Sequence, residues 1–428
     1  MGSSSCAWER GGVGGSCSSG SSSASWSGGG LDKGEVERYA RQLVLPSFGV
    51  ARQRKLKEAS VLVVGAGGLG SPVCLYLAAA GVGRIGVTDQ DDVEKSNLHR
   101  QILHDEAEVG SHKAVSASKA MRRLNSGTEV EVHLDGFRAV NALGLVEGYD
   151  VVVDASDNPA TRYCVNDACV IAGKPLVSGA AIGTDGQLSV YNHGDQCPCY
   201  RCVWPDPPQE GACQRCSDSG VLGVLPGIIG TLQALETIKV LTGAGECCSQ
   251  KLLMFDGLAT SFRSLKLRPR QEKCLVCGSS PAITRETIGS YDYEANCGGA
   301  MHDKGESACL RVLPESRRVS CEFLRSRIDG SAATDREFVV LDVRPKSEYD
   351  FAHLRGSVSL PMDALEEEVA AGAALAREGK DTYVVCRRGN DSQVAVDKLL
   401  RAGATSVFDV EGGLQRWSKA VDPTFPLY

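Results

Sequence analysis

The residues that decide the fold are VLVVGAGGLGSP, positions 61–72 of the 428-residue chain. The apolar run that begins this stretch is typical of a buried parallel strand, and the glycine-rich turn Gly65–Gly70 follows it directly. We expect a helix rich in Ala and Leu that ends at Gly81, and then a second short strand over 84–88 that is followed by Asp89. This order of elements within about thirty residues indicates a dinucleotide-type α/β fold.

The chemistry of this stretch points to a phosphate ligand. Glycines such as Gly68 let the backbone approach a phosphate, a helix N-terminus favours anions, and Asp89 can hold a ribose hydroxyl. Taken alone, the motif is also typical of a NAD or FAD site. Arg100 and Lys113 change the prediction, because positive charge is what transfer at phosphorus requires. They accompany a polar run that a dehydrogenase does not need: Ser96, Asn97, Leu98 and His99.

The turn G-x-G-G-x-G followed by D-x-D-x-V-x-x-S-N-L-x-R-Q resembles the adenylating domain of ubiquitin-activating-type enzymes. The resemblance implies a Rossmann-like α/β domain that binds ATP. It implies nucleotide contacts from the residues that match the family's motifs: Gly68, Asp89, Ser96, Asn97, Leu98, His99, Arg100, Lys113, Asp157 and Asn158.

Asp157 and Asn158 belong to the segment DASDN, residues 154–158, which follows the apolar strand expected over 150–154. Ligands of open α/β sheets bind at this carboxyl end of the strands. From the residues alone, Asp157 has an alternative role as the N-cap of a helix that starts near Pro159. D-x-S-D-N is similar to the family's magnesium and nucleotide motif, which implies that Asp157 holds Mg²⁺ against the phosphates.

The segment 34–57 is expected to form one helix that contains RYARQ, residues 38–42. An exposed helix with a few charges is the simplest interpretation of these residues. The resemblance implies more, namely that Arg41 reaches the nucleotide bound by a partner subunit. It therefore implies a homodimer with Arg41 as a catalytic residue acting in trans.

Composition narrows the class of protein. The net charge of −7 predicts no direct nucleic-acid contact, and no apolar run approaches the roughly 18 residues of a membrane span. The chain has 18 cysteines and no segment that resembles a signal peptide. Several of the cysteines form Cys-x-x-Cys pairs, which favours metal and thiol chemistry in a reducing compartment, and hence the cytoplasm. Residues 1–33 are Ser/Gly-rich, and we expect them to form a disordered tail.

Three Cys-x-x-Cys pairs start at Cys199, Cys213 and Cys274. Two such pairs supply a tetrahedral thiolate site for structural Zn²⁺, but spacing alone does not select which two. The resemblance implies the first and third pairs as zinc ligands: Cys199, Cys202, Cys274 and Cys277. It also implies a catalytic loop cysteine at Cys216. Cys213 departs from the family pattern, and a Cys213–Cys216 disulfide stays open as an alternative.

A second domain is expected from residue 319. It contains an apolar strand that ends in Asp-Val-Arg at 342–344 and a second strand that runs into Cys386. A cysteine between a strand end and a helix N-terminus receives backbone N–H groups and the helix dipole, and Arg387 and Arg388 add positive charge. We expect a lowered thiol pKa that stabilises an anionic persulfide; a buried structural cysteine is the alternative. With EGGLQRW at 411–417, these motifs resemble a single rhodanese domain.

The predicted organisation is a tail (1–33), an adenylating domain (34–290), a linker (291–318) and an α/β rhodanese domain (319–428). The combination resembles the eukaryotic adenylyltransferase and sulfurtransferase family of the molybdenum-cofactor and ubiquitin-related-modifier pathways.

That resemblance implies the cofactors ATP, Mg²⁺ and Zn²⁺, and a ubiquitin-like sulfur carrier ending in Gly-Gly as the substrate. It also implies a cysteine desulfurase as sulfur donor and a C-terminal thiocarboxylate as product, for molybdenum cofactor biosynthesis and tRNA wobble-uridine 2-thiolation. Cys216 is implied either to form a thioester or to resolve an acyl-disulfide. A conjugating enzyme and a non-catalytic scaffold are the rival functions.

Overall fold

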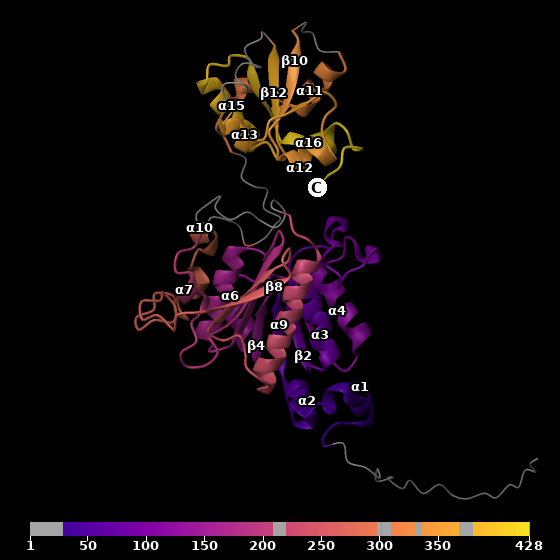
Figure 1. Ribbon diagram of the computed structural model, residues 1–428, viewed down its shortest axis with the longest axis vertical. Helices are drawn as coiled ribbons and strands as arrows, with labels where there is room; N and C mark the ends of the chain where they lie inside the picture. The colour runs from indigo at the N-terminus through magenta and orange to yellow at the C-terminus, as the bar shows by residue number, and fades with distance from the viewer. Residues whose placement is uncertain are drawn as a thin grey trace, which may run out of the picture. The chain divides into compact units, whose positions relative to one another are not determined.

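The computed structural model describes residues 29–208, 220–297, 301, 310–330, 336–367 and 380–427. The chain forms two compact units, Met1–Met301 and His302–Tyr428, and each is described by itself (Figure 1).

Unit 1 is built on an eight-stranded sheet in the order β3-β2-β1-β4-β5-β6-β7-β8. The pairs from β3 to β5 are parallel, and those from β5 to β8 are antiparallel. The strand order reverses between β1 and β4, and such a switch point is where open α/β sheets bind ligands. The strands are β1 Ser60–Val64, β2 Arg84–Thr88, β3 Glu129–His133, β4 Val151–Asp154, β5 Leu176–Ile182, β6 Asp185–Tyr191, β7 Lys251–Asp256 and β8 Ser261–Lys266.

Helices cover both faces of the central strands β1 and β4, which are apolar and buried along their whole length. In β1, Val61 and Val63 join the core under α3, α4 and α9, whereas Leu62 and Val64 join the core with α5 and α6. The helices of unit 1 are α1 Lys33–Leu43, α2 Gly49–Glu58, α3 Gly70–Ala80, α4 Lys113–Leu124, α5 Ala142–Glu147, α6 Pro159–Ile171, α7 Tyr200–Val203, α9 Val224–Thr242 and α10 Tyr293–Cys297. Short 3-10 turns are η1 Lys95–Asn97, η2 Glu106–Glu108 and η3 Ile288–Ser290.

The prediction of one helix over 34–57 is wrong, because the chain breaks between α1 and α2. Pro46 stands in the break and lacks the backbone N–H that a continuing helix needs. Gly49 then adopts a φ of +66°, which L side chains rarely adopt. The segment is therefore two helices joined by a turn.

Within the described residues, α9 is long and apolar enough to cross a membrane, by length and composition alone. The expectation that no apolar run approaches the roughly 18 residues of a membrane span is therefore wrong. Three of its polar side chains, Gln233, Glu236 and Thr237, are buried in unit 1. The Gln233 amide donates to the carbonyl oxygens of Asp154, at 2.7 Å, and Val177, at 3.3 Å. These contacts fix α9 on the sheet as a core helix.

Unit 2 contains a parallel five-stranded sheet in the order β11-β10-β12-β13-β9. Val384 of β12 packs into one core and its neighbours Tyr383 and Val385 into the other, so both faces of the sheet are covered. The strands are β9 Arg318–Val319, β10 Phe338–Asp342, β11 Val358–Ser359, β12 Asp381–Val385 and β13 Val407–Val410. The helices are α11 Cys321–Ile328, α12 Lys346–Phe351, α13 Met362–Glu367, α15 Asp391–Arg401 and α16 Gly413–Ala420, with the 3-10 turn η4 Glu315–Arg317.

The described ends of the segment 291–318, assigned to a linker from the sequence, are packed structure. At one end, the Tyr293 hydroxyl of α10 donates to Asp167 Oδ2 at 2.9 Å, which ties α10 to α6 in unit 1. At the other end, β9 pairs with β13 in unit 2. Cys309, in the middle of this segment, lies outside the described residues.

Candidate functional sites

The turn between β1 and α3 requires glycine for steric reasons. Gly65 has a φ of +97°, and a Cβ added there would lie 2.7 Å from the carbonyl oxygen of Ala155. A Cβ on Gly70 would lie 2.0 Å from the carbonyl oxygen of Gly65. Gly68 faces Arg100, whose Cγ would lie 3.3 Å from an added Cβ. The turn therefore brings the N-terminus of α3, which favours anions, next to the carboxyl end of β4 and to Arg100.

A group of acids around one lysine follows β2. Asp89 accepts hydrogen bonds from the backbone N–H groups of Ala66, at 2.8 Å, and Asp91, at 2.9 Å. Lys113 Nζ lies 3.0 Å from Asp91 Oδ2. Burial raises the pKa of Asp89, although Lys113 opposes that shift. Burial alone would lower the pKa of Lys113, but the Asp89 and Asp91 carboxylates outweigh it and raise that pKa, so Lys113 keeps its charge.

Asp157 and Asn158, the neighbouring residues that follow β4, have different roles. Asn158 Oδ1 accepts the Thr161 N–H at 2.8 Å and is the N-cap of α6, so the alternative of Asp157 as the cap is wrong. The Asp157 side chain is exposed and has no hydrogen bond or ion pair within the described part of the chain. Its charge contributes to the raised pKa of Lys113, so the two groups face the same space. Asp157 is therefore free to bind a cation there.

The sequence analysis missed the residues that hold this segment in place. Asp154 is fully buried and accepts from Arg162 Nε at 3.0 Å, from the Ser178 hydroxyl at 2.8 Å and from the Ser156 backbone at 3.1 Å. Arg162 also donates to the carbonyl oxygens of Ser156 and Gly179, both at 3.1 Å. The available signal was an acid that ends an apolar strand, with an arginine one turn into the following helix.

The predicted run from Ser96 to Arg100 forms η1 and the loop after it. Arg100 donates to Asn97 Oδ1 at 2.7 Å and to His99 Nε2 at 2.9 Å. Burial, followed by the charge of Arg100, lowers the pKa of His99, which keeps the ring neutral. Ser96 is exposed and Leu98 half-buried. The loop therefore holds the Arg100 guanidinium beside the glycine turn.

Buried polar atoms near this site have no partner among the described residues. They are Thr88 Oγ1 at the end of β2, Asp91 Oδ1, and Gln101 Oε1. The Gln101 amide nitrogen would lie 3.6 Å from a Cβ added at Gly67, so Gln101 reaches the glycine turn. A buried polar atom without a partner costs about 1–3 kcal/mol, and a polar ligand removes that cost. These atoms and the surrounding charges fit a nucleotide.

Arg41 does not join these residues within one chain. It is exposed on α1, and α1 packs at the C-terminal end of α3, where the Gln42 amide donates to the carbonyl oxygen of Ala80 at 3.1 Å. That end of α3 lies opposite the glycine turn, and Figure 1 shows α1 and α2 at the foot of the sheet. A role of Arg41 at a partner's nucleotide stays a prediction.

The structure brings four predicted zinc ligands together. The Cys199 sulfur lies 3.8 Å from that of Cys202 and 3.6 Å from that of Cys274, and the Cys202 and Cys277 sulfurs are 3.3 Å apart. Four sulfurs at about 2.3 Å from a tetrahedral Zn²⁺ would be about 3.8 Å apart, so the cluster fits that ion. Hydrogen bonds from Cys199 and Cys202 lower the pKa of Cys277 to about 6 and also lower that of Cys274.

A buried ion pair supports this cluster, and the sequence analysis missed it. Arg201 of α7 stands between Cys199 and Cys202 and binds Asp167 of α6, with its Nε 2.8 Å from Oδ1. The Tyr200 N–H donates to Asn166 Oδ1 at 2.7 Å. Asp167 also accepts the Tyr293 hydroxyl of α10. The cysteine cluster is thus anchored to α6 and α10. The Arg201–Asp167 pair could not be read from the sequence, because its two residues are 34 positions apart.

Cys213 and Cys216 lie outside the described residues, so the pairing of Cys213 and the role of Cys216 stay predictions.

In unit 2, Cys386 directly follows β12 and precedes α15, as predicted, and its side chain is 1% exposed. The Gly389 N–H donates to its sulfur at 3.0 Å, and the Ser392 hydroxyl lies 3.2 Å from it. The predicted lowering of the thiol pKa is wrong, because burial raises the pKa of Cys386 and the hydrogen bonds with Ser392 and Gly389 only partly oppose it. The resting side chain is therefore a thiol.

The terminal glycine motif shapes the loop that carries Cys386. A Cβ on Gly413 would lie 2.3 Å from the carbonyl oxygen of Cys386. That oxygen accepts the Leu414 N–H at 2.9 Å, and the Arg387 carbonyl accepts the Gln415 N–H at 2.9 Å. The start of α16 therefore braces the Cys386 loop.

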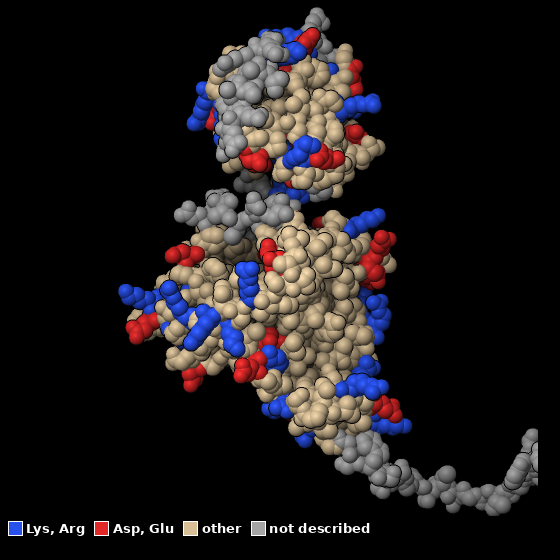
Figure 2. Space-filling view, viewed as in Figure 1, with Lys and Arg blue, Asp and Glu red and all other residues tan. Residues whose placement is uncertain are grey.

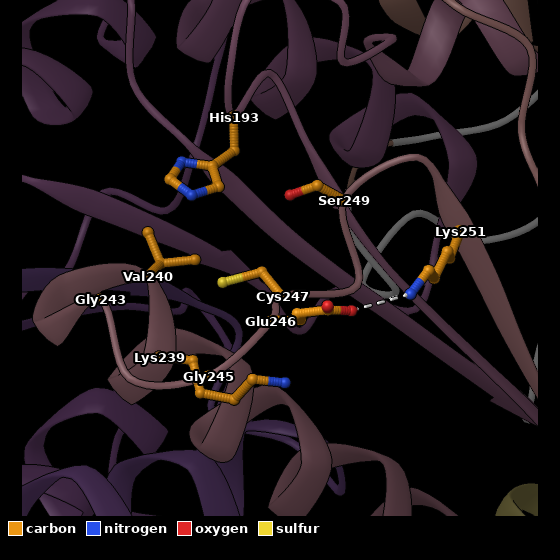
Figure 3. Close-up of a pocket in the computed structure, with 9 residues that line it drawn as sticks. All are labelled: His193, Lys239, Val240, Gly243, Gly245, Glu246, Cys247, Ser249 and Lys251. Atoms are coloured by element: carbon orange, nitrogen blue, oxygen red, sulfur yellow. Dashed lines mark ion pairs between the residues drawn. The ribbon is translucent and has the colours of Figure 1, made fainter. Parts of the chain in front are cut away.

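A separate pocket of about 460 Å³ lies beside the C-terminal end of α9 (Figure 3). It is close to the end of β6, whose last residue, Tyr191, pairs with the first residue of β5. The pocket therefore lies at the end of the sheet opposite the glycine turn and contains no predicted site residue. Its lining is His193, Lys239, Val240, Gly243, Gly245, Glu246, Cys247, Ser249 and Lys251.

Comparison with known proteins finds two families, one matching a segment of unit 1 and the other a segment of unit 2. Residues 39–276 match the ThiF family and residues 322–420 match the rhodanese-like domain. Among solved structures, the chain is similar to E. coli MccB in complex with AMPCPP and selenomethionine MccA. That match has 25% identity and a TM-score of 0.51, and it covers 56% of this chain and 74% of MccB.

Similarity to curated proteins extends over both units. The chain is 50% identical to the adenylyltransferase and sulfurtransferase MOCS3-1 of Zea mays, over 94% of this chain and 85% of that protein. It is 46% identical to MOCS3 of Arabidopsis thaliana, over 93% and 87% of the two chains. It is also 46% identical to MOCS3 of Mus musculus, over 93% and 88%. The chain therefore belongs to the MOCS3 family of adenylyltransferases and sulfurtransferases, in which a ThiF domain is fused to a rhodanese-like domain.

Proposed function

We propose that this protein adenylates the C-terminal Gly-Gly of a ubiquitin-like sulfur carrier with ATP and then converts that terminus to a thiocarboxylate. The observation that carries the proposal is the pairing of two sites in one chain. Unit 1 holds Lys113, Arg100 and a free Asp157 around a glycine turn, and unit 2 holds Cys386 between a strand and a helix.

Adenylation is the part assigned to unit 1. The carrier's carboxylate attacks the α-phosphorus of ATP, and an acyl-adenylate and pyrophosphate form. Lys113 and Arg100 balance the charge that develops on the phosphates, and Asp89 binds the ribose. Asp157 would hold Mg²⁺, which supplies charge neutralisation at the phosphates. In a homodimer, Arg41 of the other subunit adds a further positive charge to the same nucleotide.

Sulfur transfer is the part assigned to unit 2. A cysteine desulfurase loads Cys386 as a persulfide. The terminal sulfur attacks the acyl-adenylate carbonyl, AMP leaves, and an acyl-disulfide forms. Reduction of the disulfide, by Cys216 or by an external thiol, releases the thiocarboxylate. The carriers we propose are the small subunit of molybdopterin synthase and the ubiquitin-related modifier, which would serve molybdenum cofactor synthesis and tRNA thiolation.

The proposal also covers a structural metal ion, the cellular compartment and the oligomeric state. We assign Zn²⁺ to Cys199, Cys202, Cys274 and Cys277 as a structural ion, and the cytosol as the compartment that keeps these thiols reduced. Figure 2 shows few charged side chains over α9, and two apolar residues of that helix, Val224 and Leu235, are 62% and 50% exposed. This exposed apolar surface supports the proposed homodimer.

Asp157→Ala tests the proposal directly. The variant should lose carrier-dependent ATP–pyrophosphate exchange, since a metal carboxylate contributes several kcal/mol to stabilisation of the transition state. Asp195→Ala, at another exposed acid of unit 1, is the matched control and should exchange normally. Exchange near the wild-type rate in Asp157→Ala would contradict the assignment. Formation of an acyl thioester on a second carrier, with no thiocarboxylate, would favour the rival conjugating enzyme.

A further inference from the structure

A chain of buried hydrogen bonds leads away from the Cys386 sulfur. The sulfur lies 3.2 Å from the Ser392 hydroxyl of α15, and that hydroxyl donates to Asp409 Oδ1 of β13 at 2.6 Å. Asp409 Oδ2 accepts from Arg318 Nε at 2.9 Å. Cys386, Ser392 and Asp409 are all at most 1% exposed, so no bulk water competes for these bonds. Neither Ser392 nor Asp409 belongs to any motif discussed above.

The direction of the bonds follows from the number of protons. Ser392 has one hydroxyl proton, and it is directed to the Asp409 carboxylate. The Ser392 oxygen can therefore only accept from the Cys386 thiol. The resting arrangement is a thiol that donates to a hydroxyl, which in turn donates to a carboxylate. A proton can move along this path without crossing open solvent.

We propose that Asp409 is the base that ionises Cys386 and that Ser392 carries the proton between them. The Cys386 proton passes to the Ser392 oxygen as the Ser392 proton passes to Asp409, which leaves a thiolate and a neutral carboxylic acid. The thiolate then attacks the outer sulfur of thiosulfate, the S–S bond of thiosulfate breaks, and sulfite leaves with the bonding electrons. Cys386 becomes a persulfide anion, so atoms and charge balance.

This inference rests on the proposed role of Cys386 as sulfur carrier and adds the origin of its nucleophilic form. It explains how a sulfur that burial keeps neutral can react near neutral pH. Burial also raises the pKa of Asp409, which makes that carboxylate a better proton acceptor. The other charges that face this path are Arg318 from β9, Glu411 after β13, and Asp391 at the start of α15.

The test is single-turnover reaction of the full chain with thiosulfate, measured at several pH values. Mass spectrometry of the peptide that contains Cys386 reports the gain of one sulfur atom. In the wild type, the rate should change by much less than tenfold per pH unit between about pH 6 and 8, since the proton only moves within the protein. In Ser392→Ala and Asp409→Asn, it should rise about tenfold per pH unit and be about a hundredfold lower near pH 6.5.

Ser392→Thr keeps a hydroxyl and should restore the shallow pH profile. Glu411→Gln is the charge-matched control, because it removes a nearby carboxylate without cutting the path. If Asp409→Asn does not fold, Ser392→Ala decides, since it leaves the Asp409–Arg318 pair intact. A wild-type rate and profile in Ser392→Ala overturns the relay while leaving the proposed function in place. A wild-type chain that gains no sulfur on Cys386, either from thiosulfate or from a cysteine desulfurase, overturns the proposed function itself.

Discussion

In unit 1, four cysteine sulfurs lie within 4.8 Å of one another and lower the pKa of two of their number, whereas in unit 2 the Cys386 sulfur is buried alone and its pKa is raised. Cys274 is buried, as Cys386 is, and yet its pKa is lowered, so burial alone does not explain the difference. The groups that hydrogen-bond to each sulfur explain it. The clustered sulfurs hydrogen-bond to one another, which favours loss of their protons to a metal, whereas Cys386 makes its hydrogen bonds with Ser392 and Gly389. The same residue type is thus suited to holding an ion in one unit and to carrying a group in the other.

The largest effect is expected where the chemistry depends on a single sulfur. Cys386→Ala should lower thiosulfate sulfurtransfer and thiocarboxylate formation by more than about a thousandfold, because it removes the sulfur nucleophile assigned to unit 2. Pyrophosphate exchange and metal content should stay at wild-type levels, as measured by exchange assay and elemental analysis. Normal thiocarboxylate formation in this variant, with thiosulfate as donor, would remove the distinction between the two sites.

Substitution of one cluster cysteine should remove the metal and leave sulfur transfer intact, which is the reverse of the effect of Cys386→Ala. Cys274→Ser is expected to release most of the zinc and to destabilise unit 1 by several kcal/mol, because structural zinc binding is coupled to folding. Thiosulfate sulfurtransfer by unit 2 should persist. Cys197→Ser is the matched control, since Cys197 is buried nearby but lies outside the cluster. Elemental analysis and denaturant unfolding measure both effects. Retention of zinc here, with loss in Cys213→Ser, would mean that the ligand pairing is wrong.

The support beneath the cluster should contribute a smaller amount. Arg201→Met leaves the fully buried Asp167 without its cation, which costs about 3–5 kcal/mol in the free energy of unfolding. The exposed pair of Arg285 and Glu147 provides a control, and Arg285→Met should cost less than about 1 kcal/mol. Denaturant unfolding measures both. Equal losses in the two variants would show that burial of the Arg201 pair has no special effect on the metal site.

Cys74 of α3 separates the effect of burial from that of partners. It is fully buried, and burial, followed by the charge of Asp89, raises its pKa from 9.0 to about 12. Because the folded pKa is raised, its stabilising contribution is complete below pH 9.0 and is lost as the pH rises toward 12. The loss is at most roughly 4 kcal/mol. The free energy of unfolding, measured by denaturant across this pH range, should fall less steeply in Cys74→Ala than in the wild type. Parallel pH dependences of the two proteins would contradict this prediction.

Much of the fold could be predicted because the signals were local. The apolar run of β1, its glycine turn and the acid after β2 each follow from neighbouring residues, and β2 has the predicted bounds. The helix over 34–57 failed because the apolar and charged pattern outweighed one proline in the prediction. Local pattern thus identifies an element more reliably than it identifies where the element stops.

The site residues that belong to local motifs were predicted, and those that depend on the assembled fold were missed. Motifs placed Asp89, Lys113 and Asp157 around one turn, and the structure brings them together. The pairs Asp154–Arg162 and Asp167–Arg201 were missed, because their partners meet only once the strands and helices are assembled. The pKa of Cys386 was predicted in the wrong direction, since sequence reports the charges beside a residue but not how deeply its side chain is buried.

The bond between Tyr293 and Asp167 has a practical consequence for anyone who expresses the adenylating half alone. A shortened protein that stops at residue 290 loses α10 and with it a donor to the carboxylate that anchors the cysteine cluster. It also exposes apolar surface of α6 to aggregation and proteolysis. A protein that continues to Met301 keeps α10, together with the Met301 carbonyl that accepts from Asn158 and Thr161, both at 3.2 Å. The longer version is the one to purify.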